Sequence, residues 1–111
     1  MARKGRRAIA TPMIAKESMQ LLALDGQGRL MSRMDGSADW RDIVSELLRL
    51  DSQWLVIEQW RSDDPVPAPR GEDIRIARAL SRRLRPLEMK LADHVIEGDG
   101  ARFSFREAGL L

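Results

Sequence analysis

The sequence predicts a single α/β domain in which helices pack on one mixed β-sheet, with the element order β-β-α-β-α-β-β. Three observations predict this class. Short apolar or β-branched runs end at glycine-containing turns, two longer segments repeat apolar residues at helical spacing, and a proline-rich stretch separates the third strand from the second helix. The length of 111 residues fits one domain with one modest core.

The N-terminal hairpin follows a basic segment. We expect residues 1–12 to form a flexible arm and residues 13–111 to form the folded domain. Residues 19–24 and 29–34 flank the sequence DGQG, whose glycines supply the positive φ of a tight turn, so we predict two antiparallel strands. The first run is almost entirely apolar, which predicts a central strand covered on both faces.

The next segment, DGSADWRDIVSELLRL, predicts an amphipathic helix that Ser37 or Asp39 caps. Its apolar residues recur at helical spacing and are Trp40, Ile43, Val44, Leu47 and Leu48. Residues 54–60, WLVIEQW, are β-branched and aromatic and predict a buried strand. The helix therefore joins two strands of one sheet, as a right-handed crossover between parallel strands does.

The second half begins with a stiff loop at residues 61–71, since three prolines fix its backbone. A helix follows from about residue 71 to residue 84, and Pro86 ends it. Its inner face is expected to be Ile74, Ala77, Leu80 or Ser81, and Leu84. The remaining sequence predicts a strand, a Gly98-Asp99-Gly100 turn, and a last strand at residues 101–105.

Composition restricts the chemistry. The chain has no cysteine, which excludes disulfides and thiolate metal sites and fits a reducing compartment, so we expect a cytoplasmic location. No apolar run approaches the ~20 residues of a membrane helix, so we expect no membrane partner. No segment matches a glycine-rich phosphate-binding motif.

His94 is the single histidine, so a catalytic triad or a histidine base would have to use it. Its place in a predicted strand beside Asp93 favours a hydrogen-bonded structural role. An ordinary zinc site is hard to build from one histidine. An all-oxygen site for Mg²⁺, Mn²⁺ or Ca²⁺ is an alternative, with candidate ligands Glu17, Glu58, Asp63, Asp64, Glu72 and Asp73. The competing interpretation leaves these carboxylates in solvent or at a helix N-terminus.

Basic residues are concentrated in two places, although the net charge is only +2. One interpretation is an electrostatic footprint for nucleic acid, with the candidate residues Arg3, Lys4, Arg6, Arg7, Arg75, Arg78, Arg82 and Arg85. The other interpretation is a basic tail and a solvated helix face.

Several motifs together resemble one family. The segments GEDI (71–74), LADHVIEGDG (91–100) and FSFREAGLL (103–111) are similar to the end of the RadC-type JAB/MPN domain, where an SREDI-like helix start precedes LDHxIxGDGxxxSFRExGLL. Upstream, LLALDGQGRL resembles the family hairpin LLLDxxNRV, and WRDIVSELLRLDSQWLVIEQW resembles the family's helix and next strand. The resemblance covers about residues 14–111 and implies the JAB/MPN fold.

The resemblance also implies where a JAMM-type zinc site would lie. The family uses an HxH pair, a PSGDPxPS-like loop, an aspartate, and an upstream glutamate as general base. Carried over residue by residue, the two histidines fall on Glu58 and Trp60, the loop's first serine on Ser62, its closing oxyanion-binding serine on Ala68, the aspartate on Asp73 and the glutamate on Glu17. Both histidines and the closing serine are thus replaced, and an indole cannot ligate a cation.

We therefore expect an inactive member of this family, without zinc or another cofactor, that acts as a protein-interaction or scaffolding module in a DNA-repair-related context. A protein or peptide partner is expected in the former cleft, lined by Glu17, Glu58, Trp60, Ser62 and Asp73. One alternative is a nucleic-acid-binding accessory protein. Another is a residual Mg²⁺- or Mn²⁺-dependent hydrolase on Glu17, Glu58 and Asp73. JAB/MPN domains often pair, so the resemblance also raises the expectation of a homodimer.

Overall fold

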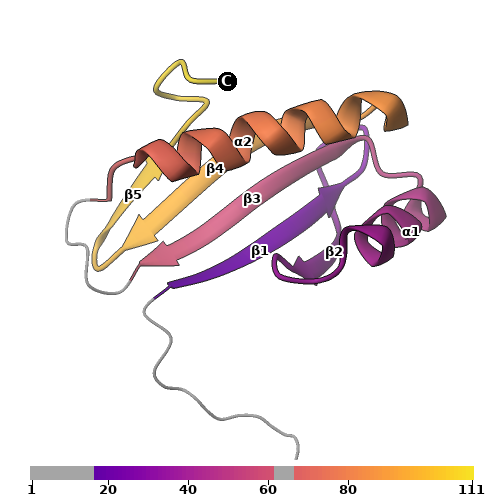
Figure 1. Cartoon of the computed structure of the whole chain (residues 1–111), viewed down its shortest axis with the longest axis horizontal. Helices are drawn as coiled ribbons and strands as arrows, with labels where there is room; N and C mark the ends of the chain where they lie inside the picture. Colours follow the sequence, from indigo (N-terminus) through magenta and orange to yellow (C-terminus); the bar gives the residue numbers. More distant parts are fainter. Residues whose placement is uncertain (1–16, 62–66) are drawn as a thin grey trace, which may run out of the picture.

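The computed structural model describes residues 17–61 and 67–111, which form a sheet layer and a helix layer (Figure 1). The elements are β1 (Glu17–Leu24), β2 (Leu30–Asp35), α1 (Trp40–Leu50), β3 (Trp54–Arg61), α2 (Gly71–Leu84), a 3₁₀ turn (Arg85–Leu87), β4 (Lys90–Gly98) and β5 (Ala101–Ser104). The predicted element order is confirmed. The arm expected over residues 1–12 lies outside the described residues.

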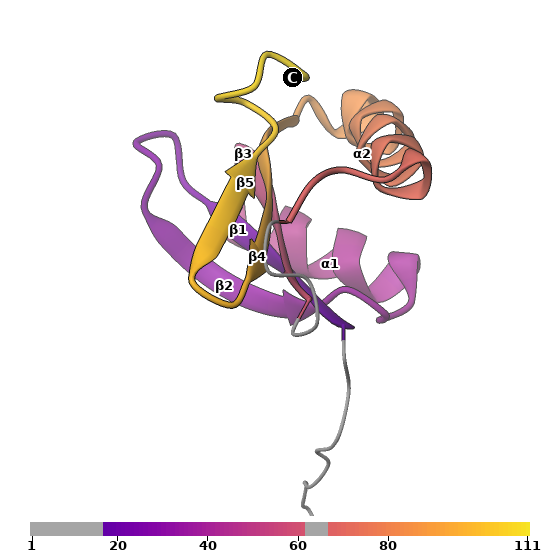
Figure 2. The same cartoon turned by 90° about the vertical axis from the view of Figure 1, so that its left-hand side faces the viewer.

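One five-stranded mixed sheet runs in the order β2-β1-β3-β4-β5. Only β3 and β4 pair in parallel, and every other neighbouring pair is antiparallel. The helix α1 joins β2 to β3, which run in the same direction with β1 between them, and α2 joins the parallel neighbours β3 and β4. Both helices lie on the same side of the sheet (Figure 2).

The core lies between the sheet and these two helices. Its buried side chains include Leu21 and Ala23 from β1, Leu55 and Ile57 from β3, Ile43 and Leu47 from α1, and Ala77, Leu80 and Leu84 from α2. The expectation that β1 is covered on both faces is wrong. Leu22 points away from the helices and is only half-buried, because neither of the two described helices packs on that face.

Local signals account for the helix ends. Asp39 caps α1 by accepting a hydrogen bond from the backbone N–H of Arg41, so Asp39 rather than Ser37 is the N-cap. On α2, Leu80 rather than Ser81 completes the inner face, and Pro86 lies in the 3₁₀ turn that ends the helix. No helix within the described residues is long and apolar enough to cross a membrane.

Two neighbouring leucines of α1 test this packing. Leu47 is 1% exposed and Leu48 is 62% exposed. We expect Leu47→Ala to lower the free energy of unfolding by about 2–5 kcal/mol, because it leaves a cavity in the core. The matched change Leu48→Ala should alter it by less than about 0.5 kcal/mol. Urea titrations of both variants make the comparison, and equal losses would contradict the packing of α1 described above.

Candidate functional site

The end of β3 separates two sets of side chains, because successive residues of a strand point to opposite faces of the sheet. Gln59 and Arg61 point toward the helices and are buried. Asp73, in the first turn of α2, is also buried and lies against both of them. Glu58 and Trp60 lie on the face without helices, where 40% of Trp60 is exposed. The two sets therefore belong to two separate surfaces.

An ion pair between Arg61 and Asp73 is the centre of the buried set. Arg61 Nη2 donates to Asp73 Oδ1, and Arg61 Nη1 donates to the backbone carbonyl of Ala68 over 3.3 Å. The second carboxylate oxygen of Asp73 accepts a hydrogen bond of 2.7 Å from the backbone N–H of Arg70, which stabilises the start of α2. This pair thus connects the end of β3, the loop at Ala68 and the first turn of α2.

Gln59 and His94 extend the pair into a buried chain of polar groups. Gln59 Nε2 donates to Asp73 Oδ1 over 3.4 Å, and Gln59 Oε1 lies 2.8 Å from His94 Nε2. A carboxylate only accepts, so the amide turns its NH₂ to Asp73 and its carbonyl to His94. His94 then donates from Nε2, and its Nδ1 has no hydrogen-bond partner among the described residues. The hydrogen-bonded role predicted for His94 is confirmed.

Burial and hydrogen bonds together set the protonation states. Burial opposes the charge of Asp73, but hydrogen bonds from Arg61 and from the Arg70 amide outweigh it and hold the pKa of Asp73 below its ordinary value. Burial lowers the pKa of His94 to about 4, although the negative charge of Asp73 acts against this shift. At neutral pH the buried set therefore contains one cation, one anion and a neutral imidazole.

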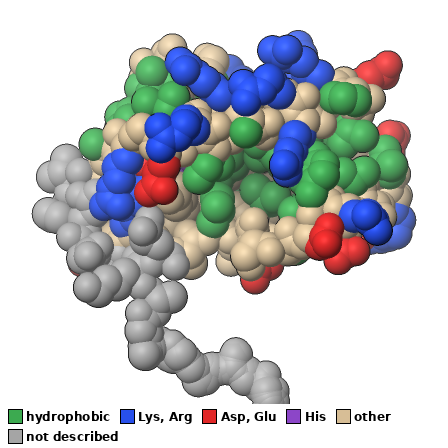
Figure 3. All heavy atoms as spheres, viewed as in Figure 1, with side chains coloured by type: hydrophobic (Ala, Val, Ile, Leu, Met, Phe, Trp, Pro, Cys, Tyr) green, Lys and Arg blue, Asp and Glu red, His purple; other side chains and the backbone are tan. Residues whose placement is uncertain are grey.

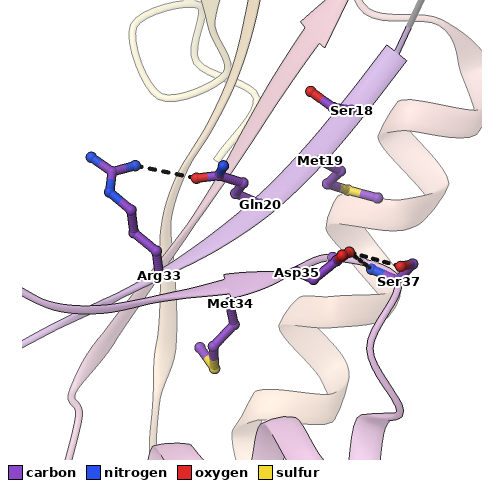
Figure 4. Close-up of a pocket in the computed structure, with 8 residues that line it drawn as sticks. Ser18, Met19, Gln20, Arg33, Met34, Asp35 and Ser37 are labelled. Atoms are coloured by element: carbon purple, nitrogen blue, oxygen red, sulfur yellow. Dashed lines mark hydrogen bonds between the residues drawn. The ribbon is translucent and has the colours of Figure 1, made fainter. Parts of the chain in front are cut away.

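Glu58 belongs to a polar cluster on the other face of the sheet. Arg33 of β2 donates to Glu58 Oε1 over 3.4 Å and to Gln20 Oε1 over 3.2 Å. Figure 4 shows Arg33 and Gln20 on one side of the β1–β2 ribbon, and Met19 and Met34 on the other side. The residues drawn there line a pocket of about 530 Å³ at the open end of this hairpin.

The structure thus separates residues that the sequence analysis placed in one cleft. Glu58 and Asp73 lie on opposite sides of the sheet and have different partners, so the described side chains do not bring them together as the alternative of a shared metal site requires. Trp60 also lies away from Asp73. Ser62 and the side chain of Glu17 are outside the part of the chain that the structure describes.

A shallow hollow remains beside the buried set. It has a volume of about 280 Å³, and Gln59, Asp73, Met19 and Ile76 are among the residues that line it. Met19 and Ile76 also line a second, apolar groove of about 320 Å³ that continues between α1 and α2 past Trp40. Figure 3 shows green apolar side chains exposed below α2, in the region of this groove.

Gln59 and Arg61 are not among the site residues predicted from the sequence. A signal for both was present, because alternation from the apolar Ile57 places residues 59 and 61 on the same face as Ile57. A buried arginine and a buried glutamine also need polar partners, and Asp73 was the nearest candidate across the loop. The family motif corresponds instead to Glu58 and Trp60 when residues are counted along the sequence.

A five-stranded mixed sheet, two helices on one face and an aspartate at the start of the second helix define a JAB/MPN-like domain. The family model described as a RadC-like JAB domain matches residues 5–110. The chain therefore belongs to the RadC-like JAB domain family, as its closing motifs predicted.

Curated relatives from several bacteria support this assignment. A UPF0758 protein of Trichlorobacter lovleyi is 36% identical over 105 residues, and the match covers 86% of this chain and 45% of the relative. A UPF0758 protein of Geobacter sulfurreducens is 34% identical over 104 residues, with the same shares covered. The chain therefore spans less than half the length of these relatives, and their names state no activity.

The buried set does not fit the zinc ion that the family resemblance implies. A guanidinium has five N–H donors, no acceptor, and a permanent positive charge, so Arg61 repels a metal cation. Gln59 Oε1 is already within 2.8 Å of His94. Within the described ranges 17–61 and 67–111, no three acidic or histidine side chains form a group that could hold a metal ion.

The free energy of unfolding should depend on pH through His94. The pKa of His94 is about 4 in the folded protein and 6.5 as the reference value, so the unfolded chain binds more protons between these two values. The stability that the neutral imidazole contributes is therefore complete above pH 6.5 and is lost as the pH falls toward 4. We expect a loss of about 2 kcal/mol between pH 7 and pH 5, measured by urea titration.

The control for this prediction is His94→Gln, which removes the chain's single histidine and keeps a hydrogen-bond donor. This variant should lose much less stability over the same interval, because carboxyl groups titrate mainly at lower pH. A loss of the same size in both proteins would assign the pH dependence to other groups.

Proposed function

We propose that this domain is a catalytically inactive member of the RadC-like JAB family that acts by binding a protein partner. The observation that carries the proposal is the buried ion pair between Arg61 and Asp73. It supplies Asp73 with a cation that cannot activate water, whereas a hydrolytic metal must keep an open position for water. The proposal includes a cytoplasmic, DNA-repair-related context.

The positions of the two family histidines are part of this proposal. A metal site needs both histidines and the aspartate on one side of the sheet, and Gln59 and Arg61 are the residues of β3 that meet Asp73. We therefore assign the HxH positions to Gln59 and Arg61, one residue later than the sequence correspondence placed them. Arg61 then stands in the place of a metal-binding histidine and carries its own positive charge to Asp73.

Two double variants test the proposal and the assignment. We expect Gln59→His/Arg61→His to bind about one zinc ion per chain, because two imidazoles and Asp73 would supply three ligands on one side of the sheet. Without zinc this variant should be destabilised by about 3–5 kcal/mol, because Asp73 loses its partner, and zinc should raise its melting temperature. Elemental analysis and thermal melts with and without zinc measure both effects.

The matched control is Glu58→His/Trp60→His, which places the same motif on the opposite face. It should bind no stoichiometric zinc. Zinc uptake by this control would show that the assignment of the HxH positions is wrong. Stoichiometric zinc in the unmodified protein, together with hydrolysis of a peptide or isopeptide substrate, would refute the inactive assignment itself.

The groove between α1 and α2 is the surface that we propose for the protein partner. It begins at the hollow beside Gln59 and Asp73 and continues over Met19, Ile76 and Trp40. An apolar groove with polar groups at one end suits a peptide segment whose apolar side chains enter it. In this proposal, the former substrate cleft retains its binding role after the chemistry is lost.

A peptide selected from a displayed random library against the whole chain tests this groove. Ala79 lines the groove on α2, so Ala79→Glu should weaken binding of the selected peptide by at least about tenfold, because it adds a charge to an apolar surface. The control Trp60→Ala changes an exposed side chain on the opposite face and should leave the affinity unchanged. If Trp60→Ala weakens binding and Ala79→Glu does not, the binding surface is the open face of the sheet.

A further inference from the structure

Four arginines along the outer side of α2 and at the start of the 3₁₀ turn that follows it have no partner within the described structure. These residues, named here the arginine line, are Arg75, Arg78, Arg82 and Arg85. None of them makes a hydrogen bond or an ion pair with another described residue. By contrast, Arg29, Arg33 and Arg49 each pair with a carboxylate. The arginine line is therefore available to an anion from outside the domain.

The geometry of the helix places these four side chains in a row. Their spacings of three, four and three residues keep them on one side of this helical segment, and all four are exposed. The row is about 15 Å long at 1.5 Å per residue. Figure 3 shows blue Lys and Arg side chains along the top of the view, over α2. Arg83 lies on another side of the helix, with its guanidinium 5.4 Å from the ring of Trp40.

No acidic residue lies within this row along the sequence. Residues 74–87, IRIARALSRRLRPL, contain five arginines and no aspartate or glutamate. The helix dipole favours cations near the C-terminus of α2, which accounts for Arg82 and Arg85. It gives no reason for Arg75 and Arg78 in the first half of the helix. Like charges three or four residues apart on a helix destabilise it, and a bound polyanion removes this repulsion.

We propose that the arginine line binds the phosphate backbone of double-stranded DNA without reading its sequence. A 15 Å row lies opposite about four to five phosphates of one strand, at about 3.4 Å of helix axis per phosphate. Contacts to phosphates carry no direct sequence information. This binding goes beyond the proposed peptide-binding function and uses the other side of α2.

A duplex fits this surface better than a single strand. Proteins that hold single strands stack the bases on exposed aromatic side chains. Phe105 is the one aromatic residue among the described residues that line the groove beside the arginine line, and it is buried, whereas the exposed Trp60 is on the opposite face of the sheet. The arginine line therefore provides positive charge for phosphates but no aromatic surface on which the bases of a single strand could stack.

An acidic peptide is the competing occupant. Arg78, Arg82 and Arg85 line one wall of a groove of about 420 Å³, and Leu110 and Leu111 line the other wall. Arginine clusters of this kind also recognise acidic or phosphorylated peptides. The row continues beyond the groove to Arg75, which favours a longer, regularly charged partner.

The test is the salt dependence of binding between the full chain and a fluorescein-labelled 20-base-pair duplex, measured by anisotropy from 50 to 200 mM KCl. If the four arginines neutralise four phosphates, the logarithm of the affinity should fall with a slope of about −3.6 against the logarithm of the salt concentration. Arg78→Ala and Arg82→Ala should each reduce the slope by about one, and the double variant by about two.

Arg41→Ala is the matched control, because Arg41 is an exposed arginine of α1 whose side chain has no ion pair within the described structure. It should leave the slope unchanged, and any contribution of residues 1–16 is common to all variants. Equal slopes for Arg78→Ala, Arg82→Ala and Arg41→Ala would overturn the proposal. Competition by poly-glutamate as strong as by unlabelled duplex of the same charge would replace DNA with an acidic peptide.

Discussion

The buried ion pair between Arg61 and Asp73 holds the functional end of this domain together. Two charges taken out of water are stable only when they pair closely and their remaining donors and acceptors are satisfied. Asp73 meets this requirement through Arg61, Gln59 and the Arg70 amide, and Arg61 through Asp73 and the Ala68 carbonyl. Because these partners come from β3, the loop and α2, the pair fixes how the strand and the helix meet.

The same pair decides which chemistry the cleft can support. An aspartate in the interior needs a cation nearby, and either a metal ion or a guanidinium satisfies this need. A metal ion with an open coordination position supplies a reactive water, whereas a guanidinium supplies only N–H donors. In the proposed function, Arg61 therefore preserves the electrostatic balance around Asp73 while removing the hydrolytic step. The neutral state of His94 is part of that balance, since a second cation beside Arg61 would upset it.

The fold followed from the sequence more completely than the site did. The predicted bounds of α2, residues 71–84, agree with the observed helix because arginines alternate with an apolar face and Pro86 ends the pattern. Predicting the site required knowing which face of the sheet each residue of β3 occupies. A shift of one residue in the correspondence moves every side chain to the opposite face. Counting residues along the family motif placed the histidine positions on Glu58 and Trp60, and the proposed assignment moves each of them by one residue, to Gln59 and Arg61. Strand alternation from Ile57 predicts which face of the sheet each residue of β3 occupies. It does not predict the contact with Asp73, because that contact arises from the packing of α2.

The helix α2 connects the two proposed binding surfaces, because its residues serve different neighbours on different sides. Asp73 and Ala77 face the sheet, Ala79 and Arg83 face the groove toward α1, and the arginine line faces solvent. A rigid helix transmits an orientation fixed at one end along its whole length. The ion pair at Asp73 fixes the rotation of α2 at its first turn, so it also sets the direction in which the arginine line points. Asp73, which corresponds to the metal-binding aspartate of the family motif, therefore determines where the charged surface of the domain lies.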